Sequence, residues 1–340
     1  MKALLLAGGK GTRLHPLTLK QPKPMIPVMD RPWLEYLVKS LRDFGICEIV
    51  FSLCHHPEKI KEHFGRGEKF GIKARYVIEK TPLGTGGAVK AAERFLGDDF
   101  LVINADIITK LDLERLIAFH MKNKALGTLT LTQVSNPAAY GLVDIDENWR
   151  IRSFTEKPQV SRRTSAWINA GVYAFSSKIF RYIPQGQAVS IERETFPRLL
   201  AEGERLFGFQ SRNYWLDMGT PQRYLKLHHD LISGRFQPAF PLEKGRGRLW
   251  IHPSAVISPQ AKLTAPCYIA EGARIEAGAQ IGPMAVIGKN VVINRGSIIR
   301  SSVLWQGASV GANTTLEQAI VGYGTKISDN DSLVAQAIAE

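Results

Sequence analysis

A glycine-rich loop followed by cations comes directly after the first apolar segment of the chain. Residues 2–7 (KALLLA) are mostly apolar without alternation, which predicts a buried parallel strand. The residues that could bind a ligand after it are Gly8, Gly9, Gly11, Thr12, Arg13, Lys20 and Lys23. Glycines let backbone N–H groups approach a ligand closely and the cations match negative charge, so the pattern suits a polyphosphate. A tight strand-to-helix turn with solvated lysines explains the glycines alone equally well.

Two common glycine motifs are absent from this loop. The dinucleotide fingerprint needs a glycine three residues after Gly11, where this chain has Leu14. A P-loop needs four residues between its first glycine and a Gly-Lys pair, and residues 8–11 (GGKG) do not supply them. The sequence therefore argues against ordinary NAD binding and Walker-type ATPase chemistry.

Two carboxylates far apart in the sequence are candidates for a metal site. Asp106 follows an apolar segment (FLVINAD), and Asp217 precedes a helix start marked by Thr220 and Pro221. Mg²⁺ binds through one or two carboxylates plus phosphate oxygens, so such a pair suits a magnesium–phosphate site. Taken singly, Asp106 also fits a loop cap and Asp217 a turn residue.

Further polar residues at predicted strand ends could bind an anion or a polyol. Glu156 and Lys157 (FTEKP) end a strand, where a charged pair is also typical of a solvated rim. Asn169 stands at a predicted strand start, where its amide could hydrogen-bond a polyol. Residues 82–87 (PLGTGG) leave a strand and open a helix, so their backbone could face a flat base.

Length and composition indicate a globular protein of two domains. The 340 residues are 44% hydrophobic and 22% charged, which excludes a disordered chain. The apolar segments fall short of the ~20 residues of a membrane span, and the apolar start is too short for a signal peptide. The cysteines, Cys47, Cys54 and Cys267, show no pairing or metal pattern, which predicts a reducing cytoplasm.

The net charge of +13 does not indicate a nucleic-acid-binding protein. Lys and Arg are spread along the chain, without a basic block interleaved with aromatic residues. We therefore expect neither nucleic acid nor a membrane as a partner, and we expect the densest basic patches to be solvated loops.

Apolar segments and helix-period segments alternate up to about residue 134. The expected strands are 2–7, 48–53, 73–78 and 100–104, and the expected helices are 32–44, 57–64, 87–95 and 112–123. This alternation predicts a parallel sheet with helices on both faces. Ligands of such sheets sit beyond the carboxyl ends of the strands, which would bring together the loops 8–13, 81–87 and 105–107.

The second part of this domain departs from strict alternation. Hairpin-like spacing predicts an antiparallel addition to the sheet, with strands at 128–134, 142–145, 151–155 and 171–175. Helices are expected at 190–202 and 221–233, and residues 235–250 are expected to form a linker. The domains predicted are therefore 1–234 and 251–340.

A strict six-residue period begins at Ile251. Apolar residues recur at every sixth position from Ile251 to Ile299, and the period resumes at Leu304 and again at Val321 after slips of one residue. Neither a helix nor an alternating strand produces period six, whereas a three-faced β-solenoid does. We expect about five coils of ~18 residues each.

The first 234 residues resemble the sugar-1-phosphate nucleotidyltransferases, also called nucleotide-sugar pyrophosphorylases. The matching pieces occur in the family's order: LAGGKGTRLHPLT, PKPMIPV, PLGTGGA, NAD, YG, FTEKP, INAG, SIERETFP and YWLDMGTP. Several members carry a left-handed β-helix behind the catalytic domain. The resemblance thus implies an α/β fold with a Rossmann-like mixed sheet, followed by a C-terminal left-handed parallel β-helix of hexapeptide repeats.

The resemblance also implies a role for each matching position. Nucleotide binding is implied for Leu6, Ala7, Gly8, Gly9, Gly11, Thr12, Arg13, Lys23, Glu79, Pro82, Gly84 and Thr85. Sugar-phosphate binding is implied for Asn104, Asp106, Gly141, Glu156, Lys157, Asn169 and Gly171. Asp106 and Asp217 would bind Mg²⁺, and Arg13, Lys23 and Asp106 would be catalytic.

The implied reaction joins an NTP to a hexose 1-phosphate and releases pyrophosphate. The mannose-1-phosphate guanylyltransferase subgroup shares most of the motifs, which implies GTP and mannose 1-phosphate. Glucose-1-phosphate uridylyl- or thymidylyltransferase activity stays open, as does a non-catalytic regulatory subunit, although the phosphate loop and both aspartates are intact. An acyltransferase activity of the solenoid is disfavoured because its one histidine is His252. A structural role is expected instead, with a homo-oligomer as the assembly.

Overall fold

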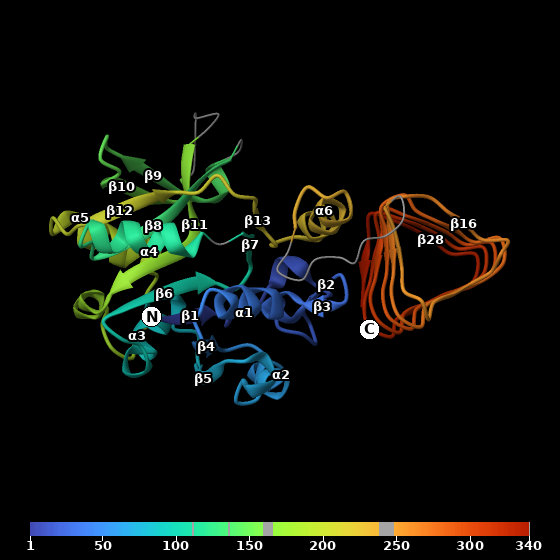
Figure 1. Cartoon of the computed structure of the whole chain (residues 1–340), viewed down its shortest axis with the longest axis horizontal. Coiled ribbons are helices and arrows are strands. Elements are labelled where there is room, and N and C mark those ends of the chain that lie inside the picture. Colours follow the sequence, from blue (N-terminus) through green and yellow to red (C-terminus); the bar gives the residue numbers. More distant parts are fainter. Residues whose placement is uncertain (111, 135–136, 159–165, 238–247, 340) are drawn as a thin grey trace. The chain divides into compact units, whose positions relative to one another are not determined.

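A computed structural model describes residues 1–110, 112–134, 137–158, 166–237 and 248–339 (Figure 1). The chain divides into two compact units. The first contains residues 1–9 and 37–216, and the second contains residues 10–36 and 217–340. The predicted linker falls largely on 238–247, outside the described residues.

Nine strands of the described chain form the central sheet of the first unit. They are β1 Lys2–Leu6, β4 Glu48–Leu53, β5 Lys73–Ile78, β6 Asp99–Asn104, β8 Gly127–Val134, β9 Gly141–Ile145, β10 Ile151–Glu156, β11 Ala166–Ser176 and β12 Leu206–Gln210. Seven lie in the order β10-β9-β11-β6-β1-β4-β5, while β8 pairs with β11 and with β12. The predicted parallel core is confirmed, because β6, β1, β4 and β5 are parallel. The predicted antiparallel addition is also confirmed, because β11 runs antiparallel to β6 and β8.

The helices carry the apolar faces that the sequence predicted. They are α1 Trp33–Asp43, α2 Pro57–Phe64, α3 Gly84–Ala91, α4 Leu113–Lys122, α5 Phe196–Ala201 and α6 Pro221–Ile232. Leu34, Leu37, Val38 and Leu41 of α1 are buried, and Gly45 ends the helix with a φ of +92°. The core of the first unit packs aromatic residues such as Phe100, Tyr173 and Phe196 against the sheet.

The structure corrects several predicted boundaries. The strand expected to start at Gly171 is β11, which starts at Ala166, so Asn169 lies inside a strand. Its pairing with β8 shifts register between Asn169 and Tyr173, and Gly171 has a φ of +74° there. A bulge therefore looked like a strand end. Helix α3 begins at Gly84 rather than Gly87, and its glycines pack closely against the segment around Val189.

Some short elements were not expected from the sequence. These are β2 Pro27–Val28, β3 Arg31–Pro32, β7 Ile107–Thr109, β12, β13 Trp215–Asp217 and the π-helix η7 Ile191–Thr195. The segment 190–202, expected to be one helix, is η7 followed by α5. Single-turn π-helices occur frequently at functional sites.

The solenoid of the second unit is a left-handed parallel β-helix with three sheets. One sheet is β14 Leu249–Ile251, β17 Cys267–Ile269, β20 Ala285–Ile287, β23 Val303–Leu304, β26 Ile320–Val321 and β29 Ala337–Ile338. The next is β15 Val256–Ile257, β18 Arg274–Ile275, β21 Val292–Ile293, β24 Ser309–Val310 and β27 Lys326–Ile327. The last is β16 Lys262–Leu263, β19 Gln280–Ile281, β22 Ile298–Arg300, β25 Thr315–Glu317 and β28 Ser332–Val334.

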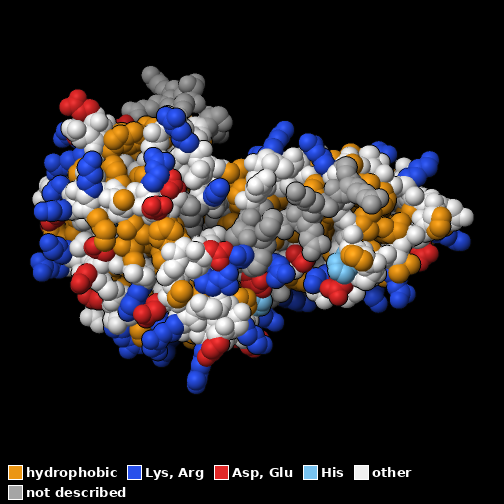
Figure 2. Space-filling view, viewed as in Figure 1, with side chains coloured by type: hydrophobic (Ala, Val, Ile, Leu, Met, Phe, Trp, Pro, Cys, Tyr) orange, Lys and Arg blue, Asp and Glu red, His pale blue; other side chains and the backbone are white. Residues whose placement is uncertain are grey.

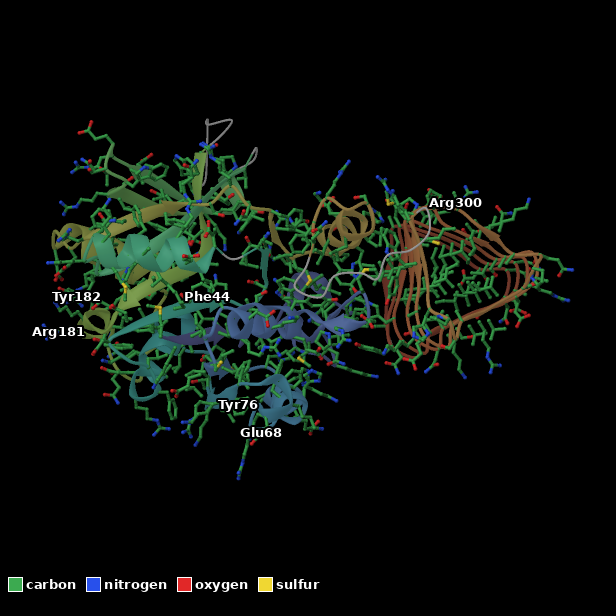
Figure 3. All side chains as sticks on the ribbon, in the orientation of Figure 1. Phe44, Glu68, Tyr76, Arg181, Tyr182 and Arg300 are labelled. Atoms are coloured by element: carbon green, nitrogen blue, oxygen red, sulfur yellow. The ribbon has the colours of Figure 1, made fainter. Side chains whose placement is uncertain are left out.

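The predicted six-residue period sets the coil length. Ile269 pairs with Ile287, eighteen residues on, whereas Ile287 pairs with Leu304, seventeen residues on. The first slip in the sequence period therefore shortens the coil by one residue and keeps the apolar position directed inward. Figure 3 shows side chains filling the interior of the three-sided coil. The prediction of a β-solenoid is confirmed.

Charged side chains of both signs are spread over the face of the molecule that Figure 2 shows. On the face shown in Figure 2, Lys and Arg side chains are scattered and interspersed with Asp and Glu. Among the described helices, none combines the length and apolarity needed to cross a membrane.

A buried hydrogen-bond chain holds the second unit together. Trp305 Nε1 of the β-helix donates to Tyr224 Oη of α6 at 2.8 Å, and Tyr224 Oη donates to Pro27 O at 2.6 Å. Met29 N donates to His228 Nε2 at 3.1 Å, and His228 Nδ1 lies 3.0 Å from Tyr224 O. Burial lowers the pKa of His228 to about 4, so the ring is neutral and donates through Nδ1. Helix α6 thereby contacts both the β-helix and the segment that carries Lys23.

Candidate active site

The end of β1 lies between the ends of two neighbouring strands. Ala7 N donates to Ser52 O at 2.9 Å, and Ala105 N donates to Leu6 O at 3.1 Å. Gly8 follows, where an added Cβ would lie 3.2 Å from Cys54 Cβ. Of the expected loops, Gly8 and Ala105 thus meet at the carboxyl edge of the sheet, while residues 10–13 belong to the second unit. A side chain at Gly8 would be tightly placed against Cys54, whereas Gly9 is exposed and open.

Glu79 fixes the loop that follows β5. Its Oε1 accepts from Ser52 Oγ at 2.8 Å, and its Oε2 accepts from Leu83 N at 2.8 Å. The residue is 8% exposed, so both of its carboxylate oxygens act mainly within the protein. Glu79, predicted to bind the nucleotide, therefore orients the start of the 82–87 loop in addition to any contact it makes with a ligand.

The glycines of PLGTGG pack against the segment around Val189. Gly86 N and Gly87 N both donate to Val189 O, at 2.8 and 3.3 Å, and Val189 N donates to Leu83 O at 2.9 Å. Gly84 has a φ of +68°, and an added Cβ there would lie 2.5 Å from Val189 O. Part of the glycine signal is thus explained by backbone packing. Pro82 and Gly84 are exposed, and Thr85 is half-buried.

Three cations surround the carboxylate of Asp217 in the second unit. Arg223 Nη1 donates to Asp217 Oδ2 at 2.7 Å, Lys23 Nζ lies 3.6 Å from Oδ1, and Arg13 Nη2 lies 3.9 Å from Oδ2. Gly11 makes this approach possible, since an added Cβ there would lie 3.2 Å from Lys23 Cβ. The side chains of Lys23 and Asp217 are 8% and 11% exposed, whereas that of Arg13 is 63% exposed. The cluster is strongly cationic overall and suits a polyphosphate.

Asp217 also has an oxygen available to a metal ion. Its Oδ1 is buried and, within the described residues, accepts no hydrogen bond, although Lys23 stands near it. Groups of three or more His, Cys, Asp or Glu side chains able to hold a metal do not occur in the described part of the chain. A metal here would therefore use one or two carboxylates plus substrate oxygens, as Mg²⁺ does. Asp106 lies just after β6 in the first unit, so its pairing with Asp217 stays a prediction.

Asn104, Asn169 and Gly171 lie close together in the first unit. An added Cβ at Gly171 would lie 2.9 Å from Asn104 Nδ2, and Gly171 N donates to Asn169 Oδ1 at 3.1 Å. Asn104 Oδ1 is buried and, among the described residues, has no hydrogen-bond donor. An unpartnered buried amide oxygen is costly, which makes Asn104 Oδ1 a candidate acceptor for a ligand hydroxyl.

Gly141, Glu156 and Lys157 form a second cluster on the neighbouring hairpin. Glu156 pairs with Gly141 in the β9–β10 ladder, and an added Cβ at Gly141 would lie 2.7 Å from Glu156 Oε2. Lys157 Nζ lies 3.3 Å from Glu156 Oε1, and its side chain is 57% exposed. Lys157 has a φ of +45°, a left-handed conformation that its backbone N–H stabilises by donating to Tyr140 O at 3.2 Å.

Sequence reasoning gave no role to three residues that the structure connects to these clusters. Arg223 contacts Asp217. Tyr173 contacts Asn169, and Glu192 contacts Thr85. Glu192 stands in the motif SIERETFP, which was the available signal for it. The sequence carried no signal for a role of Arg223 or Tyr173 beyond their position near a motif.

Two parts of the chain match known protein families. Residues 2–234 match the family described as nucleotidyl transferase, and residues 263–339 match the one described as GMPPB C-terminal domain.

Curated relatives match over most of the chain. A mannose-1-phosphate guanylyltransferase of Mycobacterium tuberculosis is 39% identical over 273 residues, covering 80% of this chain and 75% of that protein. A mannose-1-phosphate guanylyltransferase catalytic subunit beta of Dictyostelium discoideum is 36% identical over 346 residues, covering 97% and 93%. A UTP–glucose-1-phosphate uridylyltransferase of Synechocystis is 33% identical over 247 residues, covering 68% and 64%.

A solved structure shares the fold of the catalytic part. HddC from Yersinia pseudotuberculosis, complexed with GMP-PN, aligns with a TM-score of 0.58 at 31% identity, covering 66% of this chain and 97% of that one. The family match spans more than half of the chain, and its limits enclose every residue of the clusters above. By its motifs, its mixed sheet and these matches, the chain belongs to the nucleotidyl transferase family.

Proposed function

We propose that this enzyme transfers a guanylyl group from GTP to mannose 1-phosphate, giving GDP-mannose and pyrophosphate. The observation that carries the proposal is the Dictyostelium guanylyltransferase subunit, which matches 97% of this chain, the β-helix included. The GMP-PN complex of HddC, which aligns with the catalytic part, supports a guanine nucleotide.

The proposed reaction needs no general base. A phosphate monoester has a second pKa of about 6, so the sugar phosphate is largely dianionic at neutral pH. One of its oxygens attacks the α-phosphorus of GTP, a new P–O bond forms, and the bond from the α-phosphorus to the bridging oxygen breaks. Pyrophosphate leaves with the electron pair. The protein therefore has to align two anions and neutralise charge on the leaving group.

The cluster around Asp217 supplies the positive charge for this task. We propose that Arg13 and Lys23 bind the nucleotide phosphates together with the backbone of Gly8, Gly9, Gly11 and Thr12. Arg223 joins this group, because it shares the Asp217 carboxylate with them. Lys157 would guide the attacking phosphate, since its ammonium is exposed and paired only with Glu156 among the ion pairs described.

We propose Mg²⁺ as the metal, with Asp106 and Asp217 as its protein ligands. The buried Asp217 Oδ1 without a hydrogen-bond donor among the described residues supports a ligand role. When bound, the ion would offset phosphate charge and fix the orientation of phosphate oxygens. Lys23, beside the same oxygen, holds the carboxylate in place.

The remaining residues would recognise the base and the sugar. We propose that residues 79–87 face guanine through the backbone, with Leu6 and Ala7 beneath the nucleotide. Asn104, Gly141, Glu156, Asn169 and Gly171 would bind mannose hydroxyls. Gly141 and Gly171 would leave room for the polar side chains beside them, because an added Cβ would lie 2.7 Å from Glu156 Oε2 at Gly141 and 2.9 Å from Asn104 Nδ2 at Gly171.

A substrate panel tests the proposal. Pyrophosphate release is measured with GTP, ATP, UTP and dTTP against mannose 1-phosphate and glucose 1-phosphate, with Mg²⁺ varied and with EDTA. GTP with mannose 1-phosphate should give the highest kcat/KM, and EDTA should abolish it. The Synechocystis relative makes glucose-1-phosphate uridylyltransferase the second candidate. Preference for UTP and glucose 1-phosphate would overturn the mannose assignment.

We also propose a cytoplasmic location and self-association of the full chain. Light scattering after size-exclusion chromatography tests the latter, and a mass of one chain across the micromolar range would contradict it.

A further inference from the structure

Three hydroxyl groups converge on the carboxylate of Glu192. Thr85 Oγ1 donates to Glu192 Oε2 at 2.6 Å, Ser190 Oγ donates to the same oxygen at 3.0 Å, and Tyr173 Oη donates to Oε1 at 3.4 Å. Glu192 stands in the π-helix η7, Thr85 in the first turn of α3, and Tyr173 in the middle of β11. All of these residues belong to the first unit.

Glu192 determines the orientation of the Asn169 amide through Tyr173. A carboxylate only accepts hydrogen bonds, so the single phenolic hydrogen of Tyr173 is directed to Glu192. The phenolic oxygen then accepts from Asn169 Nδ2, at 2.7 Å. Asn169 Oδ1 consequently faces Gly171 N, at 3.1 Å, and the second amide hydrogen of Asn169 is the one left for a ligand. One carboxylate thus fixes which group Asn169 presents.

The same carboxylate anchors the base-facing loop through Thr85. The one hydrogen of the Thr85 hydroxyl is used by Glu192, and the hydroxyl oxygen accepts from Ile191 N at 2.9 Å. Together with the bonds from Gly86 and Gly87 to Val189 O, this ties the start of α3 to η7. Thr85 therefore acts on a nucleotide through the position of its loop more than through its hydroxyl hydrogen.

Burial makes this arrangement rigid. Tyr173 is fully buried, and burial together with the nearby Glu192 raises its pKa well above the usual value, so the phenol keeps its hydrogen at any working pH. Hydrogen bonds in such a low-dielectric environment are stronger than in water, and leaving a partner unsatisfied is costly.

We propose that Glu192 is a positioning residue shared by the two substrate sites, orienting Asn169 for the sugar phosphate through Tyr173 and the 82–87 loop for the nucleotide through Thr85. This inference rests on the proposed function, because it assigns those two sites to the two substrates. It predicts that a change at Thr85 impairs nucleotide binding alone and that a change at Tyr173 impairs sugar-phosphate binding alone. A change at Glu192 should impair the binding of both substrates.

Four single variants of the full-length enzyme test it by steady-state kinetics. Thr85→Val should raise KM for the nucleotide about tenfold and leave KM for the sugar phosphate within about twofold, whereas Tyr173→Phe should do the reverse. Glu192→Gln should raise both, because the amide replaces one acceptor by a donor. Glu194→Gln is the matched control: Glu194 is exposed in the same π-helix, accepts only from Ser190 N among the bonds described, and should change neither.

A double-mutant cycle separates positioning from general destabilisation. The effects of Glu192→Gln and Tyr173→Phe on KM for the sugar phosphate should be less than multiplicative, since both remove the same bond. Fully multiplicative effects, or a Glu192→Gln enzyme with both KM values unchanged and only a lower unfolding temperature, would overturn the proposal. If Glu192→Gln does not fold, the opposite KM effects of Thr85→Val and Tyr173→Phe decide, and equal effects on both substrates refute it.

The proposed function can fail independently of this inference. The wild-type substrate panel decides which NTP and sugar phosphate are used, and the variants are then measured with that pair. A wild-type enzyme that prefers UTP and glucose 1-phosphate would refute the guanylyl assignment, while the split between the two KM values would still test Glu192.

Discussion

Two carboxylates of this protein are satisfied in opposite ways. Asp217 is surrounded by three cations, Arg13, Lys23 and Arg223, while Glu192 is surrounded by three hydroxyl groups. The first arrangement concentrates positive charge, which the binding of phosphates requires. The second concentrates no charge but fixes the direction of hydrogen bonds, which recognition of neutral groups requires. The comparison separates a region that neutralises substrates from one that orients them.

The largest effect should follow from removing the Asp217 carboxylate. Asp217→Ala removes the carboxylate shared by Arg13, Lys23 and Arg223 and with it the proposed metal ligand, so kcat should fall about a thousandfold. Pyrophosphate release at a series of Mg²⁺ concentrations measures it. Asp217→Asn should show partial recovery at high Mg²⁺, and full activity of either variant would refute the assigned role.

A smaller loss should follow from changing Arg13. Arg13→Ala should lower kcat/KM for the nucleotide about a hundredfold, because a charge directed at the phosphates is lost. The unfolding temperature should stay within a degree or so of wild type, since the side chain is 63% exposed. Arg13→Lys serves as the charge-preserving control and should retain more activity. Comparable losses in both variants would show that guanidinium geometry matters rather than charge.

Salt should distinguish the two regions further. The Debye length falls from about 10 Å at 0.1 M to about 3 Å at 1 M, so the penalty of Arg13→Ala should shrink severalfold in concentrated salt. The penalty of Glu192→Gln should stay nearly constant, because short buried hydrogen bonds are not screened. Measurement of KM for the nucleotide at several KCl concentrations makes the comparison. Parallel salt dependence of the two variants would contradict the distinction.

Acid should weaken the frame that supports the Asp217 region. The pKa of His228 is about 4 in the folded chain, below its value of about 6.5 in an unfolded one. The unfolded state therefore binds more protons between these values, and stability is lost as pH falls from 6.5 towards 4, by at most about 3 kcal/mol. Urea unfolding followed by Trp fluorescence across this range measures the slope.

A matched pair of variants identifies His228 as the source. His228→Gln should flatten the slope, while the exposed His252→Gln should leave it unchanged. An unchanged slope in His228→Gln would mean that another group causes the acid sensitivity.

Most of the fold could be predicted because it is encoded locally. The boundaries of β4 follow from a continuous apolar segment, and the start of α2 follows from Pro57. The β-helix follows from a six-residue repeat that is visible within each coil. The strand start expected at Gly171 was wrong because a bulge and a strand end share the same local signal, a glycine after small or polar residues. β12 was not predicted because its pairing partner, β8, lies far from it in the sequence.

The candidate site was predictable in its parts and not in its connections. Glycines, lysines and aspartates at strand ends identified the phosphate-binding type, since that chemistry demands those residue types. The family resemblance then assigned a role to each of them. The contact of Arg223 with Asp217 depends on where α6 begins, and no pattern indicated it.

The sequence by itself determined the coil length of the β-helix and the order of a buried strand followed by a glycine-rich loop at the start of the first domain. It also determined the membership in the family. Only the tertiary structure decided that Thr85, Tyr173 and Glu192 form one network, although they lie on three elements far apart along the chain. The physical reason is the distance along the chain over which each signal acts. Hydrophobic periodicity and turn-forming residues act between neighbours in sequence, whereas the direction of a buried hydrogen bond depends on the partner that folding brings to it.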